Sequence, residues 1–367
     1  MGESAEPRKV FVAATGQDQG KTTVCLGLMA AFDELAPPVG FIKPVGQRYV
    51  EVDGVRVDED VALMRAIFPS DCKLADMSPV TVGRSFTRDY IHEPHPSRLV
   101  DHIRSSFQSV AAGRRTVVIE GTGHAGVGSC FDSSNADVAK LIGAGVVLVA
   151  GGGIGRPIDE VLLNQSLFAD RDVHLLGVVL NKVLPAKLES IREVVELGLR
   201  RKGIELLGCI PYEPRLANPS VRQVLEEIRG ELLNGRESLG NSIETVIVGA
   251  MAAHRAMEYI TPGCLLITPG DRDDLILAAM STFATGDAGS AIAGILLTGG
   301  SPPHANTLSM IRRTQVPVIL VPAETYSAAA AVIHLKVKTQ PADTSKIALA
   351  TQLIRRHVNV ARILERL

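Results

Sequence analysis

The chain has no tryptophan and few other aromatic residues. Phe, Tyr and Trp together make up 4% of its 367 residues, although hydrophobic residues as a whole reach 46%. That much apolar material is enough for a large folded core, which excludes global disorder. Because Gly, Ala and Val are abundant, the composition favours helices packed closely on a sheet over a β-sandwich.

An excess of charge of one sign is also missing. The chain has 38 Lys and Arg residues against 40 Asp and Glu residues, a formal net charge of -2. Proteins that coat nucleic acids carry a strong positive excess. We therefore expect no nucleic-acid partner.

Long hydrophobic runs and a cysteine pattern are absent as well. The longest weakly polar stretch, 138–155, contains Lys140 and several glycines and falls short of the roughly 20 apolar residues that a membrane helix needs. The N-terminal residues are polar, unlike a secretory signal, and the five cysteines include no C-x-x-C pair. We expect a soluble, cytoplasmic protein with reduced cysteines and no membrane partner.

The first half of the sequence repeats one pattern, in which a short β-branched run and a glycine turn precede a longer amphipathic segment. Such alternation predicts parallel strands joined by helices. Helices are expected to begin after Gly20, Pro157, Pro185 and Pro219. The expected strands are 9–14, 39–43, 116–120, 146–149, 177–180 and 206–210.

A polar segment with several glycines, 229–244, interrupts this pattern and predicts a domain boundary. The pattern then restarts, which indicates a second, smaller α/β domain. We expect domains over 1–228 and 242–345, followed by a C-terminal helix over 346–367 that packs on a neighbour or a partner subunit. The expected strands of the second domain are 245–249, 264–268, 294–298 and 318–321.

The most informative segment runs from the first expected strand directly into a helix. Small residues let backbone N–H groups turn toward a phosphate, a Lys reaches the terminal phosphates, and a hydroxyl serves Mg²⁺. Gly20, Lys21 and Thr22 supply these parts, although Gly16 and Gly20 enclose one residue fewer than usual and Thr15 stands at the expected first glycine. The segment predicts an α/β fold with a P-loop NTPase-type, mostly parallel sheet flanked by helices.

A nucleotide with Mg²⁺ also needs a carboxylate beside the loop, at the end of a neighbouring strand. Glu120 ends the expected strand 116–120 and is the first candidate, with a solvated acid as the alternative. The acidic run 58–60 offers Asp60 as a second candidate, which is either metal-linked or solvated. Lys43 ends another strand, where α/β sheets collect ligands. It either stabilises a transferring phosphate or is an ordinary surface lysine.

Two glycine-rich turns support other interpretations. Gly121 to Gly126 fits G-x-G-x-x-G after a strand, which would suggest a nicotinamide-dependent oxidoreductase, but the following residues do not open a clean helix. Within it, His124 either contacts substrate or forms a structural hydrogen bond. The second turn, 151–157, is either a ligand-facing loop or a plain connection.

Several of these motifs occur in the order found in dethiobiotin-synthetase-like P-loop proteins. They are residues 15–23, Lys43-Pro44-Val45, Glu120 to Gly123, Asn181-Lys182 and Ile210-Pro211-Tyr212, and the likeness covers roughly 8–222. Within this group the chain most resembles the N-terminal domain of long phosphotransacetylases. Residues 242–345, with 269–275 and 294–300, look like the DRTGG domain that follows there. The acetyltransferase domain that normally comes third is not in the sequence, so acetyl transfer by this chain is not expected.

The resemblance implies MgATP as the cofactor. Lys21 would contact the phosphates, Lys43 would act on the carbamate and phosphate, and Thr22 and Glu120 would lie on the metal side. Asp60 remains a metal candidate from the acidic run alone. Asn181 matches the residue that reads adenine, and Pro211 to Glu213 lines the same end. The expected nucleotide-binding residues are Thr15, Gly16, Gln17, Asp18, Gln19, Gly20, Lys21, Thr22, Thr23, Asn181, Pro211 and Glu213.

Two functions from different classes follow from the resemblance. The first is ATP-dependent activation of a small carboxylate or carbamate, with the DRTGG-like domain sensing a ligand or mediating assembly. The second is a nucleotide sensor that regulates a separate metabolic enzyme without turnover. Biotin synthesis is not expected, because the diaminopelargonate pocket of dethiobiotin synthetase has no match here. Relatives in the P-loop group are often dimers, and a dimer is expected.

Overall fold

The computed structural model describes residues 6–281, 292–335 and 337–367. By its internal contacts the chain divides into two units. Unit 1 contains Met1–Tyr212 and Thr344–Leu367, and unit 2 contains Glu213–Asp343. The division differs from the expected boundaries because residues 213–228 group with unit 2 and the C-terminal residues group with unit 1.

Unit 1 is built on a six-stranded sheet in which every neighbouring pair is parallel. The strand order is β10-β9-β8-β1-β7-β2, so β1 lies in the middle. Its interior strands are Val- and Ile-rich and almost wholly buried, as expected for a sheet covered on both faces. The strands are β1 (Arg8–Ala14), β2 (Val39–Ile42), β7 (Thr116–Glu120), β8 (Gly145–Ala150), β9 (Leu175–Val183) and β10 (Leu206–Pro211).

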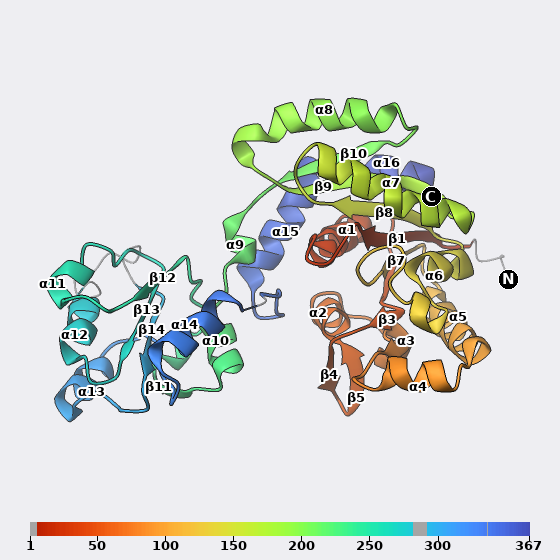
Figure 1. Cartoon of the computed structure of the whole chain (residues 1–367). Coiled ribbons are helices and arrows are strands. Elements are labelled where there is room, and N and C mark those ends of the chain that lie inside the picture. The colour runs from red at the N-terminus through yellow and green to blue at the C-terminus, as the bar shows by residue number, and fades with distance from the viewer. Residues whose placement is uncertain (1–5, 282–291, 336) are drawn as a thin grey trace. The chain divides into compact units, whose positions relative to one another are not determined.

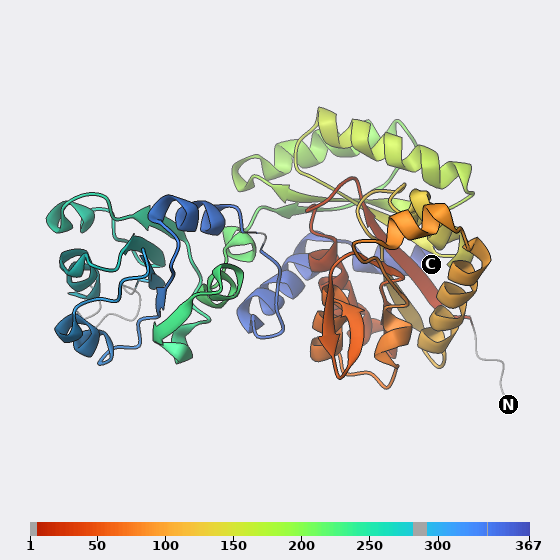
Figure 2. The ribbon, with the colours of Figure 1, turned by 60° about the horizontal axis from the view of Figure 1, so that its bottom comes forward.

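Helices cover both faces of this sheet. In Figures 1 and 2, α7 and α8 lie on one face and α1 and α15 lie on the other. The fold class is therefore α/β, with a parallel sheet flanked by helices on both faces. The helices around this sheet are α1 (Lys21–Leu35), α5 (Pro96–Ala111), α6 (Asn135–Ile142), α7 (Gly155–Asp170), α8 (Leu188–Arg200), α15 (Thr344–His357) and α16 (Val360–Arg366). Two 3-10 turns, η1 (Ser129–Phe131) and η2 (Pro185–Lys187), also belong to unit 1.

A small subdomain follows β2 and places further acidic residues near the sheet. It has two two-stranded sheets, the parallel pair β3–β6 and the antiparallel hairpin β4–β5. Its last hairpin strand ends at Asp58, which caps the next helix by accepting the Asp60 backbone N–H. The elements are β3 (Val45–Gly46), β4 (Tyr49–Val52), β5 (Val55–Asp58), α2 (Glu59–Ile67), α3 (Leu74–Met77), β6 (Val80–Thr81) and α4 (Phe86–His92).

The C-terminal segment forms two helices, rather than the single helix expected over 346–367. The helices α15 and α16 are separated at Val358, whose backbone bridges Gly208 on the edge strand β10. α15 packs on α1 so closely that a Cβ on Gly27 would overlap the side chain of Ile354. The neighbour that the terminal helix was expected to cover is therefore α1, in the same unit.

Unit 2 is a smaller α/β domain with a mixed sheet. Its order is β11-β15-β14-β13-β12, with β11 antiparallel and the other neighbours parallel. The strands are β11 (Glu231–Asn234), β12 (Thr245–Val248), β13 (Cys264–Pro269), β14 (Gly294–Thr298) and β15 (Val318–Leu320). The helices are α9 (Pro214–Ala217), α10 (Val221–Ile228), η3 (Arg236–Ser238), α11 (Ala253–Ala256), α12 (Asp273–Ser281), α13 (Ala305–Ile311) and α14 (Thr325–Ile333).

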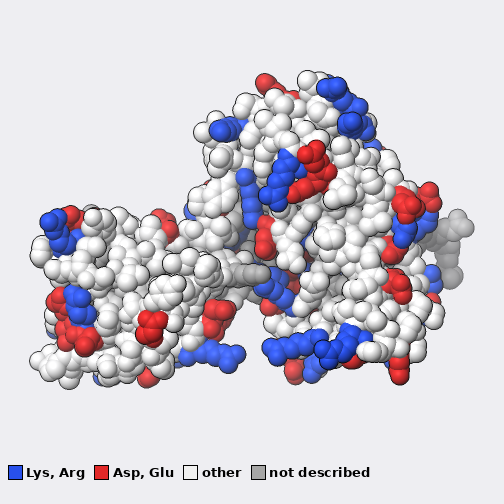
Figure 3. Space-filling model, viewed as in Figure 1, with Lys and Arg blue, Asp and Glu red and all other residues white. Residues whose placement is uncertain are grey.

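Every strand expected from the sequence is present, with its ends within three residues of the expected positions. The larger sheets contain one further strand, β11, which lies inside the polar segment that we assigned to a domain boundary. Among the described residues, no helix is long and apolar enough to cross a membrane. Basic and acidic side chains both occur on the face shown in Figure 3, in keeping with the near-zero net charge.

Candidate functional site

The loop between β1 and α1 lies at the carboxyl end of the central strand. Gly20 has a left-handed backbone with φ of 89°, and a Cβ there would overlap the amide nitrogen of Asn181. Only glycine fits both constraints. The helix begins at Lys21, so its first N–H groups face the space above the loop.

Three neighbouring elements hold this loop. The Thr15 hydroxyl donates to Glu160 Oε2 at 2.9 Å, and the Thr15 backbone N–H donates to Val149 O at 2.9 Å. From β9, Asn181 Nδ2 donates to Gln19 O at 2.8 Å and Lys182 Nζ donates to Asp18 O at 2.6 Å. The chain's own side chains therefore fix the loop in place.

Two of these anchors were missed as site residues. Glu160 carries no signal in the sequence, because it lies on α7 far along the chain. Lys182 follows Asn181 in one of the motifs of the P-loop group, and both it and Asp18 have positive φ, at 59° and 57°. Non-glycine residues adopt that conformation at a cost that the surrounding contacts must offset.

Glu120 ends β7 directly beside the start of α1. Its Oε1 accepts the Thr22 hydroxyl at 2.8 Å, whereas its Oε2 is buried with no hydrogen-bond partner among the described residues. Burial, followed by the nearby Asp60 carboxylate, raises the pKa of Glu120 to about 7, against the opposing effect of Lys43 and Lys21. Glu120 is thus a fully buried acid with unused coordinating capacity, and the solvated alternative is wrong.

Lys43 follows β2 and is buried, so the surface-lysine alternative is wrong. Its ammonium pairs with Asp60, lies 3.0 Å from Asp58 Oδ1 and 3.8 Å from Glu120 Oε1. Burial disfavours the charged form, but Glu120, Asp60 and Asp58 outweigh it and raise the pKa of Lys43. Asp60 is also buried, which overturns its solvated alternative, and Asp58 is a third acid that sequence reasoning did not single out.

Lys21 and Cys25 of α1 both lie near the Glu120 carboxylate. Burial, opposed by Glu120 and reinforced by Lys43, lowers the pKa of the Lys21 ammonium. Burial and the Glu120 carboxylate together raise the pKa of the Cys25 thiol well above its usual range, so this thiol stays protonated. A partly desolvated ammonium at the first position of α1 is well suited to an anionic oxygen.

Side chains of the kinds that usually ligate metals do not form a complete site here. No group of three or more His, Cys, Asp or Glu side chains in the described part of the chain could hold a metal ion by itself. A metal at this position would therefore need ligands from a bound molecule or from water.

Other expected residues lie outside this cluster. Pro211 ends β10, while Glu213 belongs to unit 2, where it caps α9 and pairs with Arg215 at 3.0 Å.

The glycine-rich turn over 121–126 does not form a dinucleotide-binding motif. His124 Nδ1 accepts the Gly126 backbone N–H at 3.2 Å, a structural role. After Gly126 the chain forms a 3-10 turn, and no helix begins before Asn135, unlike a dinucleotide-binding motif.

The glycine-rich turn over 151–157 packs against the loop anchors. A Cβ on Gly151 would lie 2.8 Å from the Gln19 side chain, and one on Gly152 would lie 2.7 Å from Lys182 O. Gly152 therefore has to be glycine for this close approach to the β9 backbone, whereas the Gln19 side chain could move away from a Cβ at position 151.

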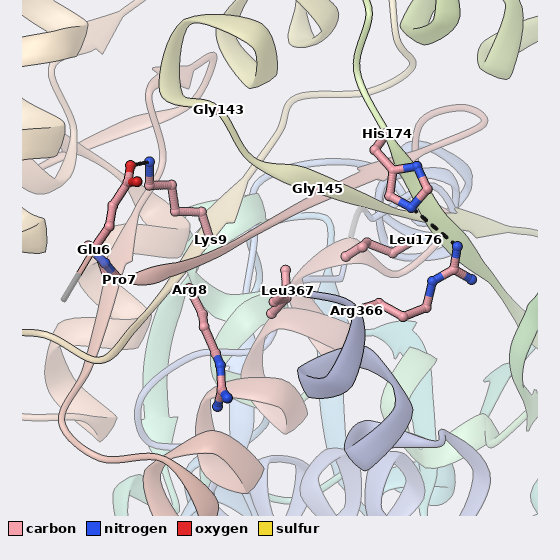
Figure 4. A pocket seen from close by; sticks show the side chains of 10 residues that line it. All are labelled: Glu6, Pro7, Arg8, Lys9, Gly143, Gly145, His174, Leu176, Arg366 and Leu367. Carbon is pink, nitrogen blue, oxygen red and sulfur yellow. Dashed lines mark hydrogen bonds and ion pairs between the residues drawn. The ribbon is translucent and has the colours of Figure 1, made fainter.

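A separate pocket of about 490 Å³ lies at the other end of the sheet (Figure 4). It is lined by residues that begin β1 and precede β9, among them Arg8 and His174, and by Arg366 of α16. Arg366 is already paired with Glu205 at 2.6 Å and contacts His174 Nε2 at 3.2 Å. Its basic groups do not contribute to the loop site.

Comparison with known proteins agrees with this architecture. The AAA domain family model matches residues 8–220, and the DRTGG domain model matches residues 223–335. The phosphate acetyltransferase of Pseudomonas putida is 30% identical, over 96% of this chain and 50% of that protein. That of Nitratidesulfovibrio vulgaris is 27% identical, over 98% and 51%. The chain thus spans about half the length of these relatives.

Among solved structures, the septum site-determining protein MinD of Pyrococcus horikoshii, complexed with Mg-ADP, matches with a TM-score of 0.34 and 14% identity, over 57% of this chain and 83% of that one. The family assignment depends on the two domain models, which together cover most of the chain. The chain belongs to the AAA domain family, as a dethiobiotin-synthetase-like P-loop domain followed by a DRTGG domain.

Proposed function

We propose that unit 1 binds MgATP at the loop between β1 and α1. The observation that carries this proposal is Glu120, whose Oε2 is buried and unpartnered among the described residues, beside the Thr22 hydroxyl. A buried acid with a free oxygen is costly unless a cation or a proton compensates it. Mg²⁺ prefers carboxylate and hydroxyl oxygens and completes its octahedron with phosphates and water, which fits a donor set that is too small to hold a metal alone.

In this arrangement Thr22, Glu120 and Asp60 would hold Mg²⁺, and the loop backbone would cradle the phosphates. Bound Mg²⁺ supplies charge neutralisation at the phosphate oxygens. Lys21, at the start of α1, would contact the terminal phosphates, and Lys43 would reach the transferring phosphoryl group. Both lysines are buried enough to act at low local dielectric, where such contacts are strong.

For an enzyme with this site we propose phosphoryl transfer to a small carboxylate or carbamate, the substrate class that the resemblance to dethiobiotin-synthetase-like proteins implies. An oxygen of the substrate would attack the γ-phosphorus, the bond to the β–γ bridging oxygen would break, and ADP would leave. Positioning and charge stabilisation account for most catalysis of this type. The substrate supplies the nucleophile, so no general base is required of the chain.

A second candidate is a nucleotide sensor without turnover. It is favoured by the relatives, which are phosphate acetyltransferases of about twice the length of this chain. Under this proposal units 1 and 2 together would regulate an acetyltransferase or another metabolic enzyme, with unit 2 binding a ligand or mediating assembly.

Measurement of ADP formation separates the two candidates. We expect the purified protein to form ADP slowly with MgATP alone and faster with one member of a panel of small carboxylates and amines. Isothermal titration in parallel would show whether ATP binds. Tight ATP binding with no ADP under any condition would instead establish the sensor, and no binding would contradict both.

We propose that Asn181 recognises the adenine ring through the side-chain amide donor and acceptor that its contacts with the loop leave free. One N–H donates to Gln19 O and the oxygen accepts the Lys182 N–H, so one N–H and one lone pair remain. We expect Asn181→Ala to weaken ATP binding about tenfold and to weaken tripolyphosphate binding less, as measured by titration.

The matched control is Lys182→Ala, which removes only a loop contact. It should weaken ATP and tripolyphosphate binding equally, because neither effect involves the base. If Asn181→Ala also loses affinity for ATP and for tripolyphosphate equally, then Asn181 only holds the loop and does not contact adenine.

A further inference from the structure

Lys43 lies among three buried acids that we call the carboxylate cluster, namely Asp58, Asp60 and Glu120. The side chains of all four residues are at most 7% exposed. The ammonium contacts Asp60 and Asp58 and lies 3.8 Å from Glu120 Oε1. Lys43 is therefore a cation of the chain itself that pairs with these acids, and the Lys21 ammonium lies near Glu120 as well.

The acids that Lys43 neutralises are largely those proposed for Mg²⁺. Asp60 is in direct contact with the ammonium, and Glu120 Oε1 is shared between Lys43 and the Thr22 hydroxyl. An ammonium and a divalent cation that approach the same two carboxylates repel each other strongly in a low-dielectric interior. Both cannot occupy this position.

Asp58 provides a place for Lys43 when a metal is present. It lies 3.0 Å from the ammonium and is fixed by its own bonds, accepting the Asp60 N–H at 3.0 Å. Gly46 makes room for it, because a Cβ there would lie 2.5 Å from Asp58 Oδ2. Asp58 is thus an ion-pair partner for Lys43 whose oxygens are not among those proposed to bind the metal.

We propose that Lys43 occupies the place of the metal in the nucleotide-free protein, and that Mg²⁺ enters only with ATP. This inference rests on the proposed MgATP site. Phosphate oxygens would supply the ligands that the small donor set lacks, and would also attract the displaced ammonium. Lys43 would remain paired with Asp58 while it turns from Asp60 and Glu120 to the γ-phosphate.

The test is Mn²⁺ binding to the nucleotide-free protein, measured by electron paramagnetic resonance for the wild type and for Lys43→Met. All proteins are compared at the same alkaline pH, because burial raises the pKa of Glu120 and protons compete with the metal for its carboxylate. We expect Lys43→Met to bind Mn²⁺ at least about tenfold more tightly than the wild type, because the competing charge is gone. The double variant Lys43→Met with Glu120→Gln should lose this gain.

Lys140→Met is the matched control, since Lys140 pairs with Asp172 at 2.9 Å on the surface. It should bind Mn²⁺ as the wild type does. If Lys43→Met is unfolded without metal, its circular dichroism should recover on addition of Mn²⁺, and Lys43→Gln gives a second measurement of the gain.

The outcomes separate this inference from the proposed function. If the wild type and both Lys43 variants bind Mn²⁺ equally, or if Mn²⁺ does not restore the fold of an unfolded variant, the proposal that Lys43 competes with the metal is wrong. The proposed MgATP site is still supported in that case if the wild type binds Mn·ATP. A wild type that fails to bind Mn·ATP overturns the proposed function itself.

Discussion

Replacing Lys21 by alanine is expected to lower the affinity for ATP roughly a hundredfold, because charge-assisted hydrogen bonds contribute about 1.5–3 kcal/mol. Lys21 begins α1, and burial already lowers the pKa of its ammonium, so a phosphate meets a partly desolvated partner. The affinity for adenosine should change little, since adenosine has no phosphate. Titration calorimetry with ATP, ADP and adenosine measures this difference.

Lys140→Ala provides the comparison, because it removes a lysine from an exposed ion pair. Its ATP affinity should equal that of the wild type. An unchanged ATP affinity in Lys21→Ala would contradict the proposed MgATP site and, with it, the roles given to Thr22 and Glu120.

The second large effect is expected from Gly27→Ala on α1. A Cβ at this position would overlap Ile354 of α15, and both residues are buried where the two helices pack together. Overpacking of this kind costs typically about 1–3 kcal/mol of unfolding free energy. Urea denaturation measures the loss, and hydrogen exchange should show faster opening of α15 than of β1.

Gly155→Ala is the control for this substitution. Gly155 also lies in a helix, but no atom lies within 4 Å of the position that a Cβ would take there. The change should be neutral or should stabilise the protein by up to about 1 kcal/mol, because alanine restricts the unfolded chain. A Gly27→Ala variant as stable as Gly155→Ala would contradict the close helix contact.

Much of the fold could be predicted from local pattern. Strands such as β7 and β14 were located to the residue, because parallel strands buried on both faces are continuous apolar runs bounded by turn residues. The loop from Thr15 to Thr22 was recognisable for a similar reason, since its chemistry is contained in one short segment. Glu120 and Lys43 followed from strand ends, which meet at one edge of a parallel sheet.

The features that were missed depend on partners far along the chain. β11 has only Leu232 and Leu233 as apolar residues, and pairing with β15 makes it a strand. Asp58 is only one member of an acidic run in the sequence, and its ion pair with Lys43 depends on the β4–β5 hairpin. The C-terminal residues gave a correct helical pattern without indicating that α1 would cover them.

The packing of α15 on α1 has a consequence for the order in which the protein can fold. The Arg355–Glu34 ion pair between these helices joins residues 321 positions apart. Contacts of such large sequence separation form late, since a long loop must close before they contribute. During synthesis α1 leaves the ribosome with one apolar face bare, and that face stays uncovered until all of unit 2 has been made. A fragment that ends before Thr344 should therefore aggregate when expressed, even though it contains the whole phosphate loop and all six strands of the sheet.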